Sequence, residues 1–162
     1  MGKVRTAAFG AHHSLVVTVD NQVYSFGRGD KGQLGHANIV TQGGDETYLE
    51  SLPKSIQDLM NRNVIQVAAG DEHSMALSVF GELWSWGGSP FGQLGHGGIM
   101  DIRKPTLLSG QHSMPMNIKA ICAGYTFSMA LTESGELFSW GQGESGELGH
   151  AQKILMYSPH EI

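Results

Sequence analysis

Residues 67–96 read VAAGDEHSMALSVFGELWSWGGSPFGQLGH, and residues 121–150 repeat the pattern as ICAGYTFSMALTESGELFSWGQGESGELGH. Aligned without gaps, the two stretches are identical at 16 of 30 positions. An earlier copy, at residues 7–36, reads AAFGAHHSLVVTVDNQVYSFGRGDKGQLGH, so the copies start 60 and then 54 residues apart. Self-similarity at such a period is the signature of a repeat protein, in which each copy folds as one supersecondary unit.

Glycine, serine and a closing LGH make up the positions that all three copies share. The glycines and histidines that we assign as structural repeat residues are Gly10, Gly70, Gly124, Gly27, Gly87, Gly141, Gly35, Gly95, Gly149, His36, His96 and His150. Because glycine adopts conformations that a Cβ disfavours, so many glycines predict many tight turns. Each histidine recurs once per copy, so the three lie in separate units and do not share a metal ion.

Each copy contains three strand-like segments. In the middle copy residues 64–70 are apolar and end on glycine, residues 73–79 alternate, and residues 83–86 are rich in aromatic side chains, which suit a pleated surface. We expect a two-residue hairpin turn between the second and third segments, because its second residue is Asn or Gly, which tolerate a positive φ. These turns are Asp20-Asn21, Phe80-Gly81 and Ser134-Gly135.

The copies diverge after LGH until each reaches a proline that an apolar residue follows three positions later. These pairs are Pro53 and Ile56, Pro105 and Leu108, and Pro159 and Ile162. Since proline is confined to edge strands or strand starts, the pattern predicts a fourth, outer strand in each unit. Residues 53–63 could instead form a short helix that begins near Pro53. The segments expected to be loops are residues 37–52, 97–104 and 151–158.

Four strands per unit at this period predict an all-β fold built from propeller blades. The motifs G-x-x-H-S-[ML]-A-L, [VL]-[YWF]-S-[WF]-G and G-[QE]-L-G-H closely resemble the RCC1 (regulator of chromosome condensation) repeat family. The resemblance implies a β-propeller, typically of seven blades. Here we expect a single RCC1-like repeat array over residues 1–162, with units at about 3–56, 64–108 and 118–162. Because three blades cannot close a ring, these four-stranded antiparallel blades form a sector, either part of a larger array or completed by association of copies.

The open sides of such a sector should be apolar, because they carry counterparts of the packing residues in the middle unit. The counterparts that we single out are Val16, Tyr24, Phe26, Met129, Phe138 and Trp140. Exposed apolar patches of blade size mark association sites. We therefore expect the isolated chain to self-associate, as a six-bladed pair, or to aggregate.

Charge and cysteine content exclude several classes of protein. The 162 residues hold 10 basic and 15 acidic side chains, with no run of Lys or Arg, so we expect no nucleic-acid partner. No apolar stretch approaches ~18 residues, and we expect no membrane association. The single cysteine, Cys122, cannot form an internal disulfide and favours an intracellular location, cytoplasmic or nuclear. Its alignment with Ala8 and Ala68 predicts a small, buried residue.

No motif predicts catalysis. Residues 27–32 and 141–146 spell G-x-G-x-x-G, but LGH and a polar loop follow them rather than the helix of a dinucleotide site. His13 and His73 align with Phe127, which argues against metal ligation. We therefore expect no catalytic, cofactor-binding or metal-binding residue, and no cofactor.

Asp71 and Glu72 are the candidate partner contacts, because they form an adjacent acidic pair on a loop directly after a repeat glycine. We expect a non-catalytic, regulatory protein–protein interaction module in which loops on one propeller face bind a protein. The resemblance implies one alternative, a guanine nucleotide exchange factor for a small GTPase, as the founding family member is for Ran. Another alternative is a propeller fragment of a larger protein, such as a ubiquitin ligase.

Overall fold

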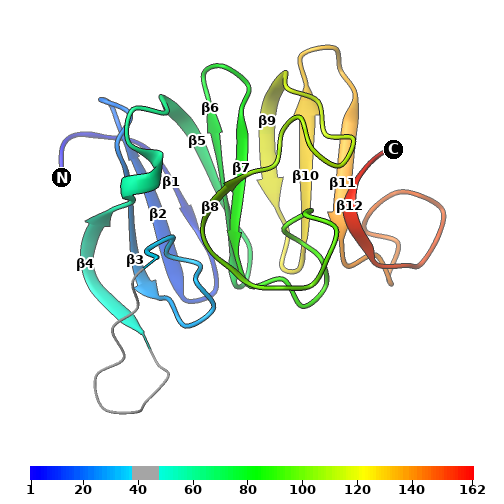
Figure 1. Ribbon diagram of the computed structural model, residues 1–162, viewed down its shortest axis with the longest axis horizontal. Coiled ribbons are helices and arrows are strands. Elements are labelled where there is room, and N and C mark those ends of the chain that lie inside the picture. The colour runs from blue at the N-terminus through cyan, green and yellow to red at the C-terminus, as the bar shows by residue number, and fades with distance from the viewer. Residues whose placement is uncertain (38–47) are drawn as a thin grey trace.

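The computed structural model describes residues 1–37 and 48–162 of the chain. Within those two ranges the strands form three four-stranded antiparallel sheets, and the helical content is one 3₁₀ turn, η1 (Gln57–Leu59). The sheets stand side by side in chain order, with the termini at opposite ends of the row (Figure 1). The expected all-β fold of three propeller blades is therefore confirmed.

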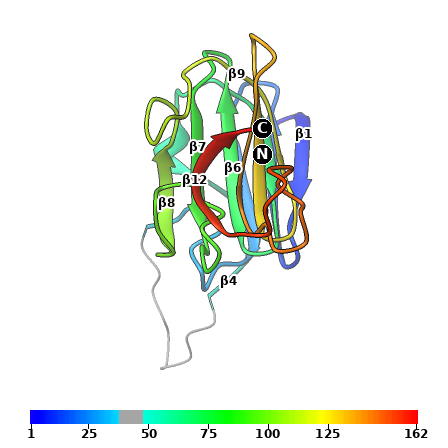
Figure 2. The ribbon, with the colours of Figure 1, turned by 90° about the vertical axis from the view of Figure 1, so that its right-hand side faces the viewer.

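Each blade runs from an inner strand through two central strands to an outer strand. The first blade consists of β1 (Val4–Phe9), β2 (His13–Thr18), β3 (Val23–Arg28) and β4 (Leu49–Ser55). The second consists of β5 (Val64–Ala69), β6 (His73–Ser78), β7 (Leu83–Gly87) and β8 (Ile102–Leu107). The third consists of β9 (Ile118–Ala123), β10 (Phe127–Thr132), β11 (Leu137–Gly141) and β12 (Met156–Glu161). Figure 2 views the row from the C-terminal side, with β12 in front.

The hairpin between the second and third strands has a three-residue loop, one residue longer than the sequence suggests. In the first blade the Thr18 N–H donates to the Gln22 carbonyl and the Asn21 N–H donates to the Thr18 carbonyl, both at 2.9 Å. The last loop residue has a positive φ, of 62° at Asn21, 78° at Gly81 and 94° at Gly135. A type I turn followed by such a left-handed residue commonly closes three-residue hairpins. The expectation of positive φ at these positions is thus confirmed.

The outer strands begin before their prolines. Pro53, Pro105 and Pro159 lie inside β4, β8 and β12, which among the described residues have a neighbouring strand on one side only and so tolerate a missing N–H. The strands therefore include the last residues of the three segments expected to be loops, and that expectation is wrong there. Most of the first such loop, residues 38–47, lies outside the described ranges. The helix alternative for residues 53–63 is wrong except for the single turn η1.

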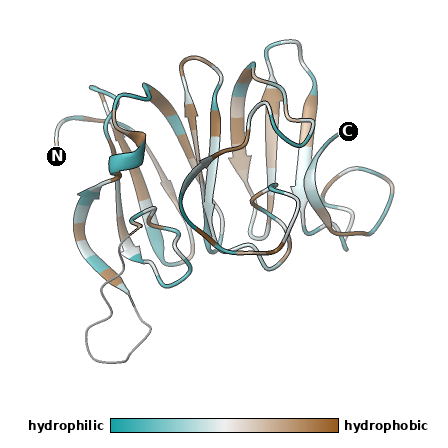
Figure 3. Cartoon of the chain, viewed as in Figure 1, coloured by the Kyte–Doolittle hydropathy of each residue, from teal (hydrophilic) through white to brown (hydrophobic). Residues whose placement is uncertain are grey.

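The core lies between the blades. One cluster joins the first blade to the second and includes Leu15, Val17, Val23, Ile56, Ala76, Trp84 and Trp86. The other joins the second blade to the third and includes Met75, Leu77, Leu83, Ile121, Ala130, Phe138 and Trp140. Hydrophobic segments accordingly follow the strands, whereas many connecting segments are hydrophilic (Figure 3). The tryptophans of β7 and β11 thus serve blade packing, as their place in the third strand indicates.

Two of the side chains assigned to the open sides belong elsewhere. Phe138 is 6% exposed and Trp140 is 0% exposed, because both face the second blade and pack in the cluster that joins the second and third blades. The prediction is wrong for these two residues because this face of the third strand packs on the preceding blade, as Trp84 and Trp86 also do. Met129 is half-buried and is not part of that cluster.

Cys122 is exposed, and the expectation that it is buried is wrong. It lies on β9 between Ile121, which packs in the core, and Ala123. Alternation along the strand therefore turns Cys122 away from the neighbouring blade. Partial burial still raises the pKa of its thiol. In the described part of the chain, no helix has the length and apolar character needed to cross a membrane.

Candidate protein-interaction surface

The turns that join the first and second strands of the three blades lie together at one end of the sector, which we call the turn end. Phe9, the Asp71 turn and the Tyr125 turn line a hollow of about 320 Å³ there. The Asp71 N–H donates to the Tyr125 carbonyl at 2.9 Å, which ties the second turn to the third. Three separate repeats therefore build one continuous surface.

Two aromatic side chains stand out from this surface. Phe9 is 72% exposed and Tyr125 is 68% exposed. Exposed aromatic residues are common anchors in protein interfaces, because each buries a large area with few rotamers to freeze. The nearby Asp71 carboxylate, which can accept a hydrogen bond from the phenol, raises the pKa of Tyr125.

Asp71 and Glu72 lie on the β5–β6 turn, and both are half-buried. Asp71 lines the hollow between the two aromatics. The Glu72 carbonyl accepts a hydrogen bond from the Gly88 N–H at 2.8 Å, so the turn is held against the β7 end. The nearby Arg28 guanidinium is bound by Asp30, whose carboxylate accepts from Nε at 2.8 and 2.9 Å. Asp30, Asp71 and Glu72 all raise the pKa of Arg28. We call Phe9, Asp71, Glu72 and Tyr125 the turn surface.

Six of the nine repeat glycines lie at or against the turns of the turn end. Gly10 and Gly70 sit at its base, where an added Cβ would overlap the imidazole of His13 or His73 and approach the carbonyl of the next turn. Gly27, Gly87 and Gly141 have φ between 105° and 109°, and a Cβ there would meet the preceding turn carbonyl. Gly35, Gly95 and Gly149, in the LGH loops, have φ between 74° and 81°. Gly124 packs against Phe127.

Pairs of histidine and serine link neighbouring blades. His13 Nε2 lies 2.8 Å from Ser74 Oγ, and Ser74 Oγ donates to the Gln33 carbonyl at 2.8 Å. Since the hydroxyl has one proton, His13 Nε2 must be the donor to Ser74. His73, Ser128 and Gln93 repeat the arrangement between the second and third blades, at 2.9 and 2.9 Å.

These imidazoles are neutral and do not activate their serines. Burial lowers the pKa of His13 to about 4 and that of His73 to about 3. The Nδ1 atoms of both rings are buried without a hydrogen-bond partner in the described structure. A general base must accept the serine proton, whereas here Nε2 donates and the serine proton points to a carbonyl. The pairs are therefore structural.

The three LGH histidines make the same bond inside each blade. Their Nε2 atoms lie 2.9 to 3.0 Å from a serine of the third strand, whose hydroxyl donates to the carbonyl of the LGH leucine. The pairs are His36 with Ser25, His96 with Ser85, and His150 with Ser139. Each bond pins the loop after the third strand onto its own blade. The histidine therefore recurs for a structural reason.

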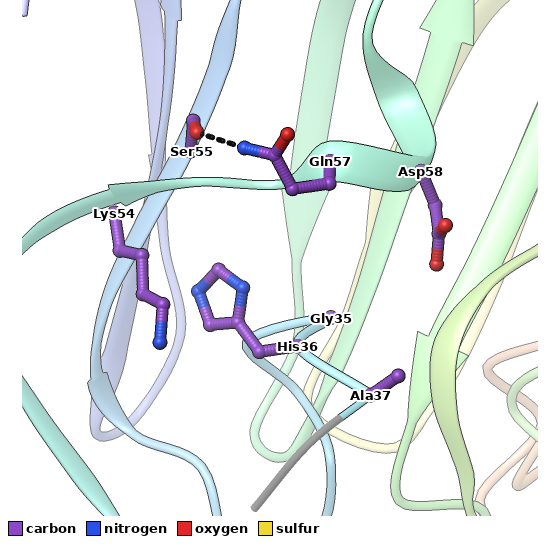
Figure 4. A pocket seen from close by; sticks show the side chains of 7 residues that line it. All are labelled: Gly35, His36, Ala37, Lys54, Ser55, Gln57 and Asp58. Carbon is purple, nitrogen blue, oxygen red and sulfur yellow. Dashed lines mark hydrogen bonds between the residues drawn. The ribbon is translucent and has the colours of Figure 1, made fainter.

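A second hollow, of about 280 Å³, lies beside His36 at the outer edge of the first blade. Figure 4 shows the His36 ring and the Lys54 side chain reaching into it, with Gln57 and Asp58 on the far side. Lys54 Nζ pairs with Glu50 at 3.2 Å. Burial, and then the Lys54 charge, lower the pKa of His36. Both groups are thus engaged in the blade, and we assign no ligand to this hollow.

Metal binding has no candidate site among residues 1–37 and 48–162, where no three His, Cys, Asp or Glu side chains come close enough to share an ion. The arrangement at the turn end can instead recognise a protein, because it offers carboxylates and aromatic rings on a firm base. Sequence reasoning identified Asp71 and Glu72 but missed Phe9 and Tyr125. Neither aromatic residue recurs at its aligned position, so the repeat pattern gives no signal for them.

Comparison with known proteins agrees with this architecture. A model of the "Regulator of chromosome condensation (RCC1) repeat" matches residues 20–77 and 81–131, and a second model of the same description matches residues 4–33, 64–93 and 118–147. The E3 ubiquitin-protein ligase HERC2 of Homo sapiens is 34% identical over 165 residues, which cover 99% of this chain and 3% of HERC2.

Two solved structures share the fold over almost the whole chain. Human WBSCR16 matches with a TM-score of 0.83 and 30% identity, over 99% of this chain and 38% of that one. Prp20p of Saccharomyces cerevisiae, described with its binding properties to Gsp1p and histones, matches with a TM-score of 0.82 and 28% identity, over 98% and 38%. The chain thus spans well under half of each of these proteins. With repeat models matching all three blades, the chain belongs to the RCC1 repeat family.

Proposed function

We propose that this chain is a non-catalytic protein-interaction module whose turn surface binds a basic segment of another protein. The observation that carries the proposal is the turn surface itself, where the exposed aromatic rings of Phe9 and Tyr125 flank Asp71 over a shallow hollow and Glu72 adds a second carboxylate on the same turn. Lysine or arginine side chains pair with carboxylates and pack on aromatic faces, so both features favour the same partner. We also propose that the chain works inside the cell, in the cytoplasm or the nucleus, as its single cysteine suggests.

The negative charge of this chain indicates that its partner is basic. The chain has a net charge of −5, so its surface as a whole attracts a basic partner. The turn surface then determines which basic segment binds. Prp20p is described with binding properties to histones, and histones are rich in lysine and arginine. Histones therefore serve as a probe of basic-segment binding by this chain.

The test is a binding titration of purified core histones against the chain and two variants. Asp71→Asn/Glu72→Gln removes both carboxylate charges of the turn surface, and we expect about tenfold or greater weakening, in line with the loss of charge-assisted hydrogen bonds. The matched control, Asp58→Asn/Glu161→Gln, removes two charges from exposed positions at the opposite end. Equal weakening in both variants, or no binding by the parent chain, contradicts the proposal.

Nucleotide exchange is the second candidate, because Prp20p, described with Gsp1p, matches nearly the whole chain. In this alternative the turn surface wedges into a small GTPase and opens its nucleotide site. The assay measures release of fluorescent GDP from Ran with and without the chain. Accelerated release that the Phe9→Ala/Tyr125→Ala variant abolishes supports exchange activity; an unchanged rate leaves simple binding as the function.

The match to HERC2 supports one further proposal, that the sector works as the recognition part of a longer protein. Because the chain spans 3% of HERC2, that protein's ligase activity is not a property to assign to these blades. The histone titration addresses the recognition role directly, whichever chain carries the sector.

A further inference from the structure

Arg28, at the end of β3, is held by the carboxylate of Asp30. The Arg28 Nε–H lies 2.8 Å from one carboxylate oxygen and 2.9 Å from the other, and Nη2 lies 2.6 Å from the second oxygen. Burial raises the pKa of Asp30, but the hydrogen bond and the charge of Arg28 outweigh it, so the pKa lies below its usual value. Arginine and carboxylate in such a forked contact form one of the stronger kinds of ion pair.

A second group of carboxylates lies close to the same guanidinium. The loop after β3 lies against the second blade, where a Cβ on Gly88 would come 3.4 Å from Lys31 Cβ and 3.2 Å from Glu72 Cβ. The pKa of Arg28 is raised first by the residue that holds it and then by the charges of Glu72 and Asp71. Arg28 therefore has one carboxylate in its own loop and two on the turn surface.

The third blade shows what happens at this position without a cation. By the repeat alignment, Gln142 and Glu144 correspond to Arg28 and Asp30. The Gln142 Nε2 atom donates to the Glu144 carboxylate at 3.4 Å, and its Oε1 atom accepts from the Thr126 hydroxyl on the turn end. A side chain at this position thus contacts both the acidic residue two positions later and a turn of the turn end. Because glutamine is neutral, it cancels no charge there.

Arg28 is a potential competitor of any basic partner. A guanidinium is charged at every physiological pH and binds carboxylates through several N–H donors at once. Without Asp30, the carboxylates that remain near Arg28 are those of Asp71 and Glu72. A bond to either one would occupy acceptor atoms and cancel one negative charge of the turn surface.

We propose that Asp30 is a positioning residue, which holds Arg28 away from Asp71 and Glu72 and so keeps both carboxylates available to a basic partner. Asp30 acts through Arg28 and does not itself contact the partner. The inference rests on the proposed function, because it concerns the charges that the turn surface offers to a basic segment. It adds the residue that sets how strongly that segment is bound.

The first experiment follows Arg28 without any partner, by measuring the exchange of its Nε–H with solvent by NMR. Exchange should be slow in the parent chain, where Asp30 accepts the bond, and slow in Asp30→Asn, where Asp71 or Glu72 accepts it instead. Exchange should become fast in the triple variant Asp30→Asn/Asp71→Asn/Glu72→Gln. Fast exchange in the parent chain or in Asp30→Asn overturns the proposal, as does slow exchange in the triple variant.

The second experiment is a double-mutant cycle on the binding of purified core histones. Asp30→Asn should weaken binding about fivefold or more, because the released Arg28 takes a carboxylate from the partner. In the Arg28→Gln background the same substitution should change binding by about twofold or less, since no cation is left to release. An equal loss in both backgrounds overturns the proposal, because Asp30 would then act through its own charge.

Glu144→Gln is the matched control for the cycle. It removes the same charge at the corresponding position of the third blade, where the neutral Gln142 cannot compete for the turn surface. We expect binding within about twofold of the parent chain. Weakening as large as that of Asp30→Asn overturns the proposal. If the parent chain binds no histones, the proposed function fails, whereas the exchange rates still decide whether Asp30 holds Arg28 away from Asp71 and Glu72.

Discussion

Gly87 occupies a position where the backbone conformation and the close packing admit only glycine. Its φ is 109°, and an added Cβ would meet the Glu72 carbonyl and lie 2.9 Å from His73 Cα. Any larger residue therefore suffers both a strained φ and a backbone clash. The glycine holds the end of β7 against the turn that carries Asp71 and Glu72, so its effect reaches the turn surface.

Replacing Gly87 by valine should lower the free energy of unfolding by roughly 1–3 kcal/mol, in line with strain at special backbone positions. Urea denaturation of the variant and the parent chain measures this. Gly98→Ala is the control, because a Cβ there has open space, and it should stay within about 0.5 kcal/mol. Equal stability of the Gly87 variant and the parent chain would show that the backbone relaxes freely.

Ser74→Ala should lower the free energy of unfolding by about 1–3 kcal/mol. The substitution leaves the His13 Nε2–H, and one lone pair of the Gln33 carbonyl oxygen, without a hydrogen-bond partner in a buried interface. Thermal unfolding detects the change as a lower Tm. The exposed Ser145, whose side chain makes no hydrogen bond in the described structure, supplies the control Ser145→Ala. A Tm equal to that of the control contradicts the role assigned to the serine.

The backbone conformation of some residues was predictable because the same kind of residue, one that tolerates a positive φ, recurs at that position in the three copies. The hairpin residues Asn21, Gly81 and Gly135 follow from turn chemistry alone. Cys122 was not predictable in this way, because the aligned Ala8 and Ala68 pack in clusters shared with the following blade, whereas no described residue covers the same face of the third blade. Phe138 and Trp140 were assigned to the wrong side because the alignment with Trp84 and Trp86 does not tell which neighbouring blade covers that face of the strand.

Between elements, the histidine links make the stability of the sector depend on pH. The pKa of His13 falls to about 4 and that of His73 to about 3 in the folded chain, from the usual 6.5. Below pH 6.5 the unfolded chain therefore binds more protons than the folded chain. Stability is complete above about pH 6.5 and declines as the pH falls towards 4, by up to about 3 kcal/mol per histidine.

Urea midpoints between pH 7 and pH 4.5 test this dependence on the parent chain and on His73→Phe. Phenylalanine already occupies the aligned position 127, so the variant has a natural precedent in the third blade. We expect its stability to fall less steeply with decreasing pH than that of the parent chain. Identical slopes would assign the pH dependence to other groups.

At the scale of strands, periodicity and turn residues were enough to identify all three sheets. The outer strands were placed too late, because their first residues pair with the third strand across a register shift near Gly27, Gly87 and Gly141. Such a bulge admits residues without an alternating pattern, so the periodicity there is too weak to extend the strand. The sequence also did not predict that Ser74 hydrogen-bonds to the neighbouring blade, although this serine is identical in all three copies.

At the scale of the whole molecule, the candidate site is a product of assembly. Phe9, Asp71 and Tyr125 are more than 50 residues apart in sequence and meet because the inner strands of three blades lie side by side. Sequence reasoning could find only the acidic pair, whose two members are adjacent. The aromatic members depend on the order and packing of the blades, which no single repeat encodes.

The central claim is that the turn surface is where a protein partner binds. Hydrogen–deuterium exchange of the chain, alone and saturated with core histones, tests it most directly because it locates the contact. We predict slowed exchange at residues 9–12, 70–72 and 124–126, with the hairpins at residues 79–82 and 133–136 unchanged. Protection confined to those hairpins, or to the outer strands, would contradict the claim.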